Sequence, residues 1–324
     1  MPTSPLNKPQ NNPQNTPTET PFRGTWPALL TPLNADLSIN HARFAAHAKA
    51  LLAAGCGGVT AFGTTGEGTS FSVAERIAAV EALVAASLPA QCIIVGTTAA
   101  ALPDAVALTR HATAIGAHGS LLLQPFYYKG LSDAGVIDYF AQVIDQVAEQ
   151  LGNHSLRLYL YHIPQIAGVG LTHGVIAALK ARYPQVIVGI KDSAGDLAHS
   201  LALADAFMPG VRVYVGHELH LPTLARRGST GAISGLANLL PRTVTALVEQ
   251  ADSPETDARL ARVADLLNRL RPFGAFAANK GVMALHSGDT GWLRVRPPLL
   301  ALDAAGLAQL KAALEGFHFD PATD

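Results

Sequence analysis

The chain has 324 residues, of which 49% are hydrophobic and 15% are charged, and its formal net charge at pH 7 is -1. This length and apolar content suffice for one large core or two smaller ones. No long basic run occurs, which argues against a partner such as nucleic acid or an anionic membrane and favours a small molecule. The only cysteines, Cys56 and Cys92, lack CxxC spacing, which indicates a reducing compartment rather than a disulfide scaffold.

Residues 1–21 are crowded with Pro, Asn, Gln and Thr and contain almost nothing that could be buried. We therefore expect a disordered tail. It lacks the apolar segment of a signal peptide and the arginines of a transit peptide. No apolar run downstream approaches the roughly 20 residues needed to span a bilayer. The sequence predicts a soluble, cytoplasmic protein without membrane contact.

Eight short apolar runs rich in β-branched residues follow the tail and are predicted to be strands. They cover residues 26–32, 57–63, 92–98, 120–125, 156–164, 186–192, 211–216 and 231–235. Alanine-rich amphipathic segments separate most of them, at 41–55, 72–87, 101–116, 135–150, 171–183 and 196–207. Repeated strand-then-helix units indicate an α/β fold with a parallel sheet, and eight units predict a (β/α)8 TIM barrel. An open doubly wound sheet is the alternative.

Helix-capping residues stand where two of these helices would begin. Asn40 precedes the first as an N-cap, and Ser72 precedes the second with Glu75 three residues later, the spacing of a capping box. We expect the barrel to span residues 22–240. Three further helical segments, 241–250, 255–274 and 303–317, predict that residues 241–324 form an added C-terminal helical bundle.

Polar residues at the C-terminal ends of barrel strands are the candidates for catalysis, because the active site of this fold is built there. Lys191 directly follows an apolar strand run and shares a face with Gly189, which leaves room beside it. A water-poor barrel mouth disfavours the ammonium form, and a neutral amine can attack a ketone to give a Schiff base. A structural lysine paired with a carboxylate such as Asp192 is the alternative.

The segment GTTGEG at 63–68 offers two hydroxyls and glycines whose backbone N–H groups could cradle an anion. The Lys and Ser/Thr of a phosphate P-loop are absent, so a carboxylate is the expected ligand, although a plain glycine turn also fits. Tyr161 shares a strand face with Tyr159. It either caps the core with a wet hydroxyl or shuttles protons with a hydroxyl neighbour such as Thr64.

Histidines do not form a recognisable metal motif in this sequence. GHELH at 216–220 brings His217, Glu218 and His220 together, but the helical zinc motif needs histidines four residues apart. His162 is interpreted as structural or as a supporting residue behind the site. We therefore predict no metal site.

Four motifs, in this order and spacing, resemble the dihydrodipicolinate synthase / N-acetylneuraminate lyase family of Schiff-base aldolases. They are GTTGE at 63–67, YxxP at 161–164, GIKDSxGD at 189–196 and VRPPLLAL at 295–302. The resemblance runs from about Phe22 to the end of the last predicted helix. It implies a class I lyase and a homo-oligomer, a dimer or a tetramer.

The resemblance also implies roles for individual residues. Lys191 would form the imine with pyruvate or another 2-keto acid, and Tyr161 would move protons to and from the carbinolamine and the aldol oxygen. Because the protonated imine serves as the electron sink, no cofactor is expected. Thr65, with the backbone N–H groups of its loop from Gly63 onward, would hold the carboxylate of the keto acid.

Two further groups complete the implied site. Thr64 and Tyr127 would form a hydroxyl relay with Tyr161, and Tyr127 would enter from a neighbouring subunit. Ile233 would lie close to the lysine and present its carbonyl.

The second substrate is where the sequence departs from the family pattern. Dihydrodipicolinate synthases usually carry an arginine two residues after the proline of YxxP, and Ile166 stands there. Sialic-acid and sugar-acid members have an apolar residue at this position. Hydroxyl-binding residues would then come from Ser193, His217 and Glu218, although GHE is not the acidic pattern of sialic-acid lyases.

The sequence therefore predicts a Schiff-base lyase that cleaves or forms an aldol bond or dehydrates a 2-keto-3-deoxy sugar acid. A 4-hydroxy-tetrahydrodipicolinate (dihydrodipicolinate) synthase with an atypical second-substrate site is one alternative. The other is a non-catalytic regulator that binds a keto acid, but such a protein would not need an imine-forming amine.

Overall fold

The structure, a computed structural model, describes residues 24–151, 156–319, 323 and 324. The predicted tail, residues 1–21, lies outside the described residues. Eight strands are present: β1 (Gly24–Thr25), β2 (Val59–Ala61), β3 (Ile93–Gly96), β4 (Gly119–Leu123), β5 (Leu158–His162), β6 (Ile187–Asp192), β7 (Arg212–Val215) and β8 (Gly231–Ala232).

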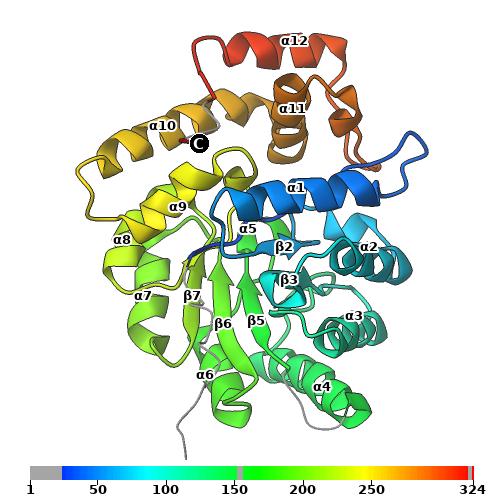
Figure 1. Ribbon diagram of the computed structural model, residues 1–324. Coiled ribbons are helices and arrows are strands. Elements are labelled where there is room, and N and C mark those ends of the chain that lie inside the picture. Colours follow the sequence, from blue (N-terminus) through cyan, green and yellow to red (C-terminus); the bar gives the residue numbers. More distant parts are fainter. Residues whose placement is uncertain (1–23, 152–155, 320–322) are drawn as a thin grey trace, which may run out of the picture.

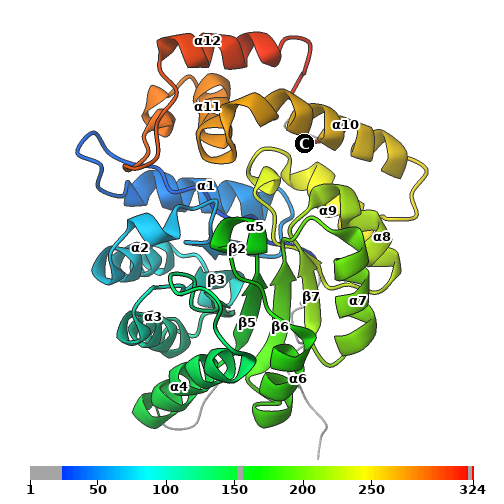
Figure 2. The same ribbon diagram turned by 180° about the vertical axis from the view of Figure 1, so that it is seen from behind.

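The strands are parallel and pair in the order β1-β8-β7-β6-β5-β4-β3-β2. A parallel bridge between Ala28 and Thr60 joins the chain after β1 to β2, and the Leu29 N–H donates to the Thr60 carbonyl at 2.9 Å. The sheet is thereby closed on itself, with helices around it (Figures 1 and 2). The predicted α/β fold with eight parallel strands is confirmed and is consistent with a TIM barrel, and the contact between Ala28 and Thr60 contradicts the open-sheet alternative.

The helices follow the strands in chain order. They are α1 (His41–Ala53), α2 (Val73–Ala85), α3 (Leu102–Ala114), α4 (Asp133–Leu151), the short α5 (Pro164–Ala167), α6 (His173–Arg182), α7 (Leu197–Phe207) and α8 (Leu221–Arg226), then α9 (Pro241–Glu249), α10 (Thr256–Leu270), α11 (Ala275–Ser287) and α12 (Ala304–Ala313). Figure 1 shows α10, α11 and α12 gathered at one end of the barrel, beyond α1. A helix is present at each of the six helical segments predicted within the barrel, and only α4 extends beyond its predicted bounds.

The predicted caps are confirmed. The Asn40 side chain accepts from the Arg43 N–H at the start of α1. Ser72 and Glu75 form the capping box of α2, each side chain accepting from the other's backbone N–H. These bonds satisfy amides that no helical carbonyl reaches, so they fix where both helices begin.

The first predicted strand, 26–32, is wrong in position. The regular strand is β1 at Gly24–Thr25. Beyond it the pairing is irregular: the N–H groups of Trp26 and Ala28 donate to the carbonyls of Ala232 and Ser234 at 2.8 Å, and Ala28 forms an isolated bridge to Thr60. Pro27 has no N–H to donate to a neighbouring strand, which interrupts the ladder. The fifth strand is shorter than predicted for a related reason: it ends at His162 because Pro164 begins α5.

Helix α11 was not predicted from the sequence, and α8 was also missed. A helix that packs on one side shows an apolar stripe, but α11 is covered on several sides: its successive residues 278–282 are all buried. These include the polar residues Asn279 and Lys280, which break any apolar pattern. The helix therefore gives no clear periodic signal.

Aromatic side chains fill the barrel interior below Lys191. The Tyr159 ring occupies the space beside Gly189, where an added Cβ would lie 2.6 Å from a ring carbon. It packs edge-on against Tyr214 with ring centroids 5.7 Å apart, and its hydroxyl lies 2.9 Å from Nε2 of His118. The glycine thus makes room for the neighbouring tyrosine, which forms a rigid floor under the strand end.

We looked for membrane-spanning helices among the described residues. None of the helices in this part of the chain is both long and apolar enough to cross a bilayer.

A buried histidine joins α1 to the end of the barrel. Nε2 of His47 lies 2.9 Å from Oδ1 of Asn238, which also accepts from the Leu30 N–H at 3.1 Å. The side-chain amide of Asn238 donates to the Ala28 carbonyl at 2.8 Å. Burial lowers the pKa of His47 from 6.5 to about 4, so its neutral form is favoured in the native state.

We predict that this histidine makes the protein less stable in acid. Between pH 6.5 and about 4 the unfolded chain binds a proton at position 47 that the native state does not. Its contribution to the free energy of unfolding is complete above pH 6.5 and falls, by about 3 kcal/mol, as the pH drops to 4. Urea unfolding of the protein and of His47→Gln should show a smaller loss on acidification in the variant. Parallel curves would contradict this assignment.

Candidate active site

Lys191 and Tyr161 stand opposite each other at the ends of two adjacent strands. The register of β5 and β6 pairs the two residues directly. Nζ of Lys191 donates to the Tyr161 hydroxyl at 3.3 Å and lies 4.6 Å from the centre of its ring. Both side chains are buried. The amine is therefore held at a fixed place in a water-poor setting, next to a group that can give or take a proton.

The alternative in which Lys191 pairs with Asp192 is not what the structure shows. The carboxylate of Asp192 accepts from the Ser200 hydroxyl at 2.5 Å and contacts Nδ1 of His199 at 3.2 Å. Successive side chains of a strand point to opposite faces, so the aspartate lies behind the strand that carries the lysine.

Thr64 extends the hydrogen-bonded pair to a third group. Its hydroxyl lies 3.0 Å from that of Tyr161, and either can be the donor. The predicted neighbours Lys191, Tyr161 and Thr64 are thus brought together from β6, β5 and the loop after β2. Hydroxyls in contact can pass a proton from one to the next.

The loop after β2, residues 62–70, has an unusual backbone. Phe62 and Glu67 both adopt φ of 57°, which is uncommon for residues other than glycine. Gly68 is required here, because a Cβ at this position would lie 2.1 Å from the Phe62 carbonyl oxygen. The Gly68 N–H donates to the Gly63 carbonyl at 3.1 Å and closes the turn. Such conformations concentrate at functional sites and persist only where their surroundings hold them.

A cavity of about 300 Å³ opens beside this loop, and Gly63, Thr64, Tyr161 and Ile166 line it. Further hydroxyls come from Thr69, Ser70 and Thr98, and apolar walls come from Phe126, Ile163, Phe276 and Leu299. Among the described lining residues Glu67 is the only charged one, and it forms an ion pair with Lys280. The cavity therefore offers hydroxyls and apolar surface but no cation.

Other predicted site residues are not among those that line this cavity. Lys191 is one of them, and it meets the cavity through its contact with the lining residue Tyr161. Thr65 lies against the turn after β8, where a Cβ on Gly235 would be 2.9 Å from its hydroxyl. Ile233 is buried in the barrel interior. Tyr127 is 74% exposed and packs edge-on against Tyr128.

Two residues predicted to bind the second substrate are engaged elsewhere. A Cβ on Gly216 would lie 2.1 Å from the Ser193 hydroxyl, so this side chain is tucked against the end of β7. Glu218 is buried, and its Oε1 accepts from the Ser234 hydroxyl at 2.5 Å and from the Leu236 N–H at 3.4 Å. In this position the carboxylate holds the turn after β8.

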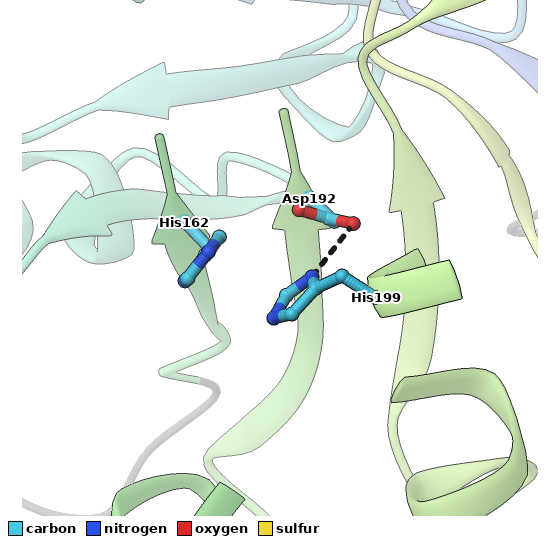
Figure 3. Close-up of side chains that lie close together, drawn as sticks. All are labelled: His162, Asp192 and His199. Atoms are coloured by element: carbon cyan, nitrogen blue, oxygen red, sulfur yellow. Dashed lines mark hydrogen bonds and ion pairs between the residues drawn. The ribbon is translucent and has the colours of Figure 1, made fainter. Parts of the chain in front are cut away.

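His162, Asp192 and His199 form a cluster behind the catalytic strands (Figure 3). Each offers a ligand atom within 4.8 Å of the others, the spacing that a metal ion could use. However, Nδ1 of His162 accepts the Leu171 N–H at 3.0 Å, so the neutral ring carries its proton on Nε2 and has no free lone pair there. Burial lowers the pKa of His162, which favours this neutral ring. The geometry fits a hydrogen-bonded support better than a metal centre.

Sequence reasoning missed Glu67, Lys280 and Phe276 as parts of the site. Glu67 belongs to the GTTGE motif, but its partner Lys280 and the cavity residue Phe276 lie on α11. The one available signal was a lysine within a stretch of small and apolar residues. That signal gives no partner, because 213 positions separate the two charges along the chain.

Comparison with known proteins agrees with this architecture. Residues 21–316 match the Dihydrodipicolinate synthetase family. An "Uncharacterized DapA-like lyase" of Chloroflexus aurantiacus is 35% identical over 298 residues, which cover 90% of this chain and 96% of the relative.

Two solved structures have the same fold. Dihydrodipicolinate synthase from Agrobacterium tumefaciens superimposes with a TM-score of 0.83 at 32% identity, covering 91% of this chain and 99% of the other. YagE from E. coli K12, a prophage protein of the dihydrodipicolinic acid synthase family solved in complex with pyruvate, gives 0.81 at 26% identity, with 92% and 99% covered. The resemblance seen in the motifs is confirmed: the chain is a lyase of the dihydrodipicolinate synthetase family.

Proposed function

We propose that the protein is a Schiff-base lyase in which Lys191 forms an imine with pyruvate or another 2-keto acid. The observation that carries this proposal is the chain of contacts from the Lys191 amine to the Tyr161 hydroxyl at 3.3 Å and on to the Thr64 hydroxyl at 3.0 Å. Burial excludes water from the amine, and the neighbouring hydroxyls supply the protons that imine formation must exchange.

The chemistry begins when the neutral amine attacks the keto carbon and gives a carbinolamine. Tyr161 donates a proton to the departing hydroxyl, so water leaves and a protonated imine forms. This cation draws electrons from the bond between C3 and C4, which breaks in aldol cleavage while the deprotonated Tyr161 oxygen takes the proton of the C4 hydroxyl. The aldehyde leaves, and protonation of the remaining enamine at C3 restores the imine. Condensation runs these steps in reverse. In dehydration the same electron sink promotes loss of the C3 proton and then of the 4-hydroxyl. Water finally returns the keto acid and the free amine.

The keto acid also needs a grip on its carboxylate. Thr65 and the N–H groups of the loop beginning at Gly63 are assigned this role, and the carbonyl of Ile233 is assigned a place near the amine. The glycine-rich backbone of this loop supports the assignment, since it permits close approach of an anion. A fixed carboxylate orients the keto carbon toward Lys191 and lowers the entropic part of the barrier.

Tyr127 is assigned to the active site of a neighbouring subunit. Its 74% exposure and that of Tyr128 at 69% support an oligomer in which this surface is covered. Exposed neighbouring aromatic side chains are typical of protein interfaces.

The part of the substrate beyond its keto-acid end is proposed to enter the cavity and to be neutral and hydroxylated. A 2-keto-3-deoxy sugar acid carries one carboxylate, beside its keto group, and only hydroxyls beyond it. The cavity matches this with Thr69, Ser70 and Thr98 and with the apolar Ile166. The predicted roles of Ser193 and Glu218 in binding these hydroxyls receive no support from their positions, because both side chains are packed elsewhere.

Condensation of pyruvate with aspartate semialdehyde is the alternative, since the Agrobacterium neighbour is a dihydrodipicolinate synthase. That substrate would bring a second carboxylate to a wall without a cation. The pairing of the Lys191 amine with the Tyr161 hydroxyl disfavours a regulator that only binds a keto acid, because binding alone does not require an amine next to a proton donor.

The covalent step predicts that borohydride traps pyruvate on Lys191. Reduction of the imine should leave one stable adduct per chain, located by peptide mass mapping. Lys191→Met should abolish the adduct, whereas Lys180→Met, a lysine on α6, should retain it. Labelling of Lys280 in place of Lys191 would show that the assignment is wrong.

The proton-transfer role predicts that Tyr161→Phe retains the fold and loses about 100- to 10,000-fold in kcat. Tyr159→Phe is the matched control, because this buried tyrosine of the same strand contacts His118 rather than the amine. It should keep near-normal turnover with the preferred 2-keto acid. Equal effects of the two substitutions would mean that Tyr161 only packs the core.

The neutral cavity predicts that a 2-keto-3-deoxy sugar acid is turned over with a higher kcat/KM than pyruvate with aspartate semialdehyde. A carboxylate placed against Ile166 would lose its water without gaining a partner. Ile166→Arg should shift the ratio toward the semialdehyde by offering a charge-assisted pair, whereas Ile166→Leu should leave it unchanged. Efficient semialdehyde condensation by the unmodified protein would restore the biosynthetic alternative.

A further inference from the structure

A buried ion pair connects the loop after β2 to the C-terminal helices. Glu67 in the loop and Lys280 on α11 form this pair, and both side chains are almost completely excluded from solvent. We propose that Glu67 and Lys280 are positioning residues that hold the loop in the conformation in which Thr64 and Thr65 act. This inference rests on the proposed function, because those two threonines are assigned their roles there.

Each charge of this pair depends on the other. Burial lowers the pKa of Lys280, while Glu67 opposes that effect. An isolated charge in the interior is far more costly than a paired one, so removing either partner leaves the other uncompensated. Nζ of Lys280 also donates to the Arg294 carbonyl at 2.7 Å, which fixes the amine from a second direction. The loop therefore meets an anchored cation.

Glu67 is placed where a small shift would reach the reacting groups. Its N–H donates to the Thr64 carbonyl at 2.9 Å, so the backbone of the two residues moves together. The Thr64 hydroxyl in turn lies 3.0 Å from the Tyr161 hydroxyl. A displacement of the glutamate is thus passed through one turn of backbone to the proposed proton relay.

The backbone at Glu67 explains why an anchor is needed. Its φ of 57° is unfavourable for a residue with a side chain, and the same value recurs at Phe62 on the other side of the loop. A loop of this kind relaxes unless its surroundings determine it. Other bonds help: the Thr31 hydroxyl donates to the Gly66 carbonyl at 2.7 Å, and Arg296 donates to the Ser70 carbonyl at 3.0 Å.

The same helix also reaches the cavity directly. Phe276 lies one turn before Lys280 on α11 and lines the cavity, as do Pro298 and Leu299 further along the chain. The C-terminal segment therefore completes the wall of the site and holds its loop. The ion pair links these two tasks, because it sets the distance between α11 and the end of β2.

Three variants separate a positioning role from a purely structural one. Glu67→Gln and Lys280→Met each leave one buried charge alone, whereas the double variant removes both charges and should recover thermal stability. Val263→Ala in α10 is the control. It removes buried apolar atoms from the core among the C-terminal helices, and Val263 is far from the loop in sequence and does not line the active-site cavity. Each protein is assayed for borohydride trapping of pyruvate and for amide hydrogen exchange in residues 63–70.

We expect both single variants to lose stability and to trap pyruvate about 10- to 100-fold less efficiently, since small misplacements of catalytic groups have effects of this size. The double variant should regain its melting temperature, yet still trap poorly and exchange residues 63–70 faster than the unmodified protein. Val263→Ala should lose stability but trap normally.

Recovery of trapping together with stability in the double variant, or unchanged exchange in residues 63–70, would overturn the inference. If the unmodified protein traps no pyruvate, the proposed function fails instead. The exchange measurement still decides whether the ion pair orders the loop, because it needs no substrate.

Discussion

The contact between the Lys191 amine and the Tyr161 hydroxyl is the constraint around which the rest of the site is arranged. It follows from the parallel register of β5 and β6, which places the two residues side by side at the strand ends. A lysine on a flexible loop would have to be ordered at each turnover. Here the strands have already fixed the amine and its proton partner, so little orientation remains to be gained when substrate binds.

Three groups of residues pack around the pair of Lys191 and Tyr161 from different sides. Below it, the ring of Tyr159 fills the barrel between Gly119 and Gly189. Behind it, Asp192 bonds to His199 and Ser200 and ties the strand end to α7. Beside it, the loop of Thr64 closes the relay. Tyr159, Asp192 and Ser200 are buried and each is hydrogen-bonded to a neighbour, which is the condition under which polar side chains can stand in an apolar interior.

The sequence predicted the parts of this arrangement that depend on local patterns. Alternating strands and helices predicted the barrel, and capping side chains predicted the starts of α1 and α2, because both signals lie within a few residues. Lys191 and Tyr161 were found as polar residues at the ends of apolar runs. The Lys280–Glu67 pair was not found, since it joins distant segments through a helix whose buried polar residues hide its periodicity. Nor could the burial of Glu218 be foreseen, because its partner Ser234 is defined only by the closed barrel.

The central claim is that the amine of Lys191 becomes covalently bonded to a 2-keto acid beside the Tyr161 hydroxyl. A crystal structure of the protein soaked with pyruvate tests this most directly. The account predicts continuous density from Nζ of Lys191 to the keto carbon of pyruvate. The Tyr161 hydroxyl should lie within hydrogen-bonding distance of Nζ, and the pyruvate carboxylate should lie against the loop of Thr65. Pyruvate bound without a covalent bond, or attached to another lysine, would contradict it.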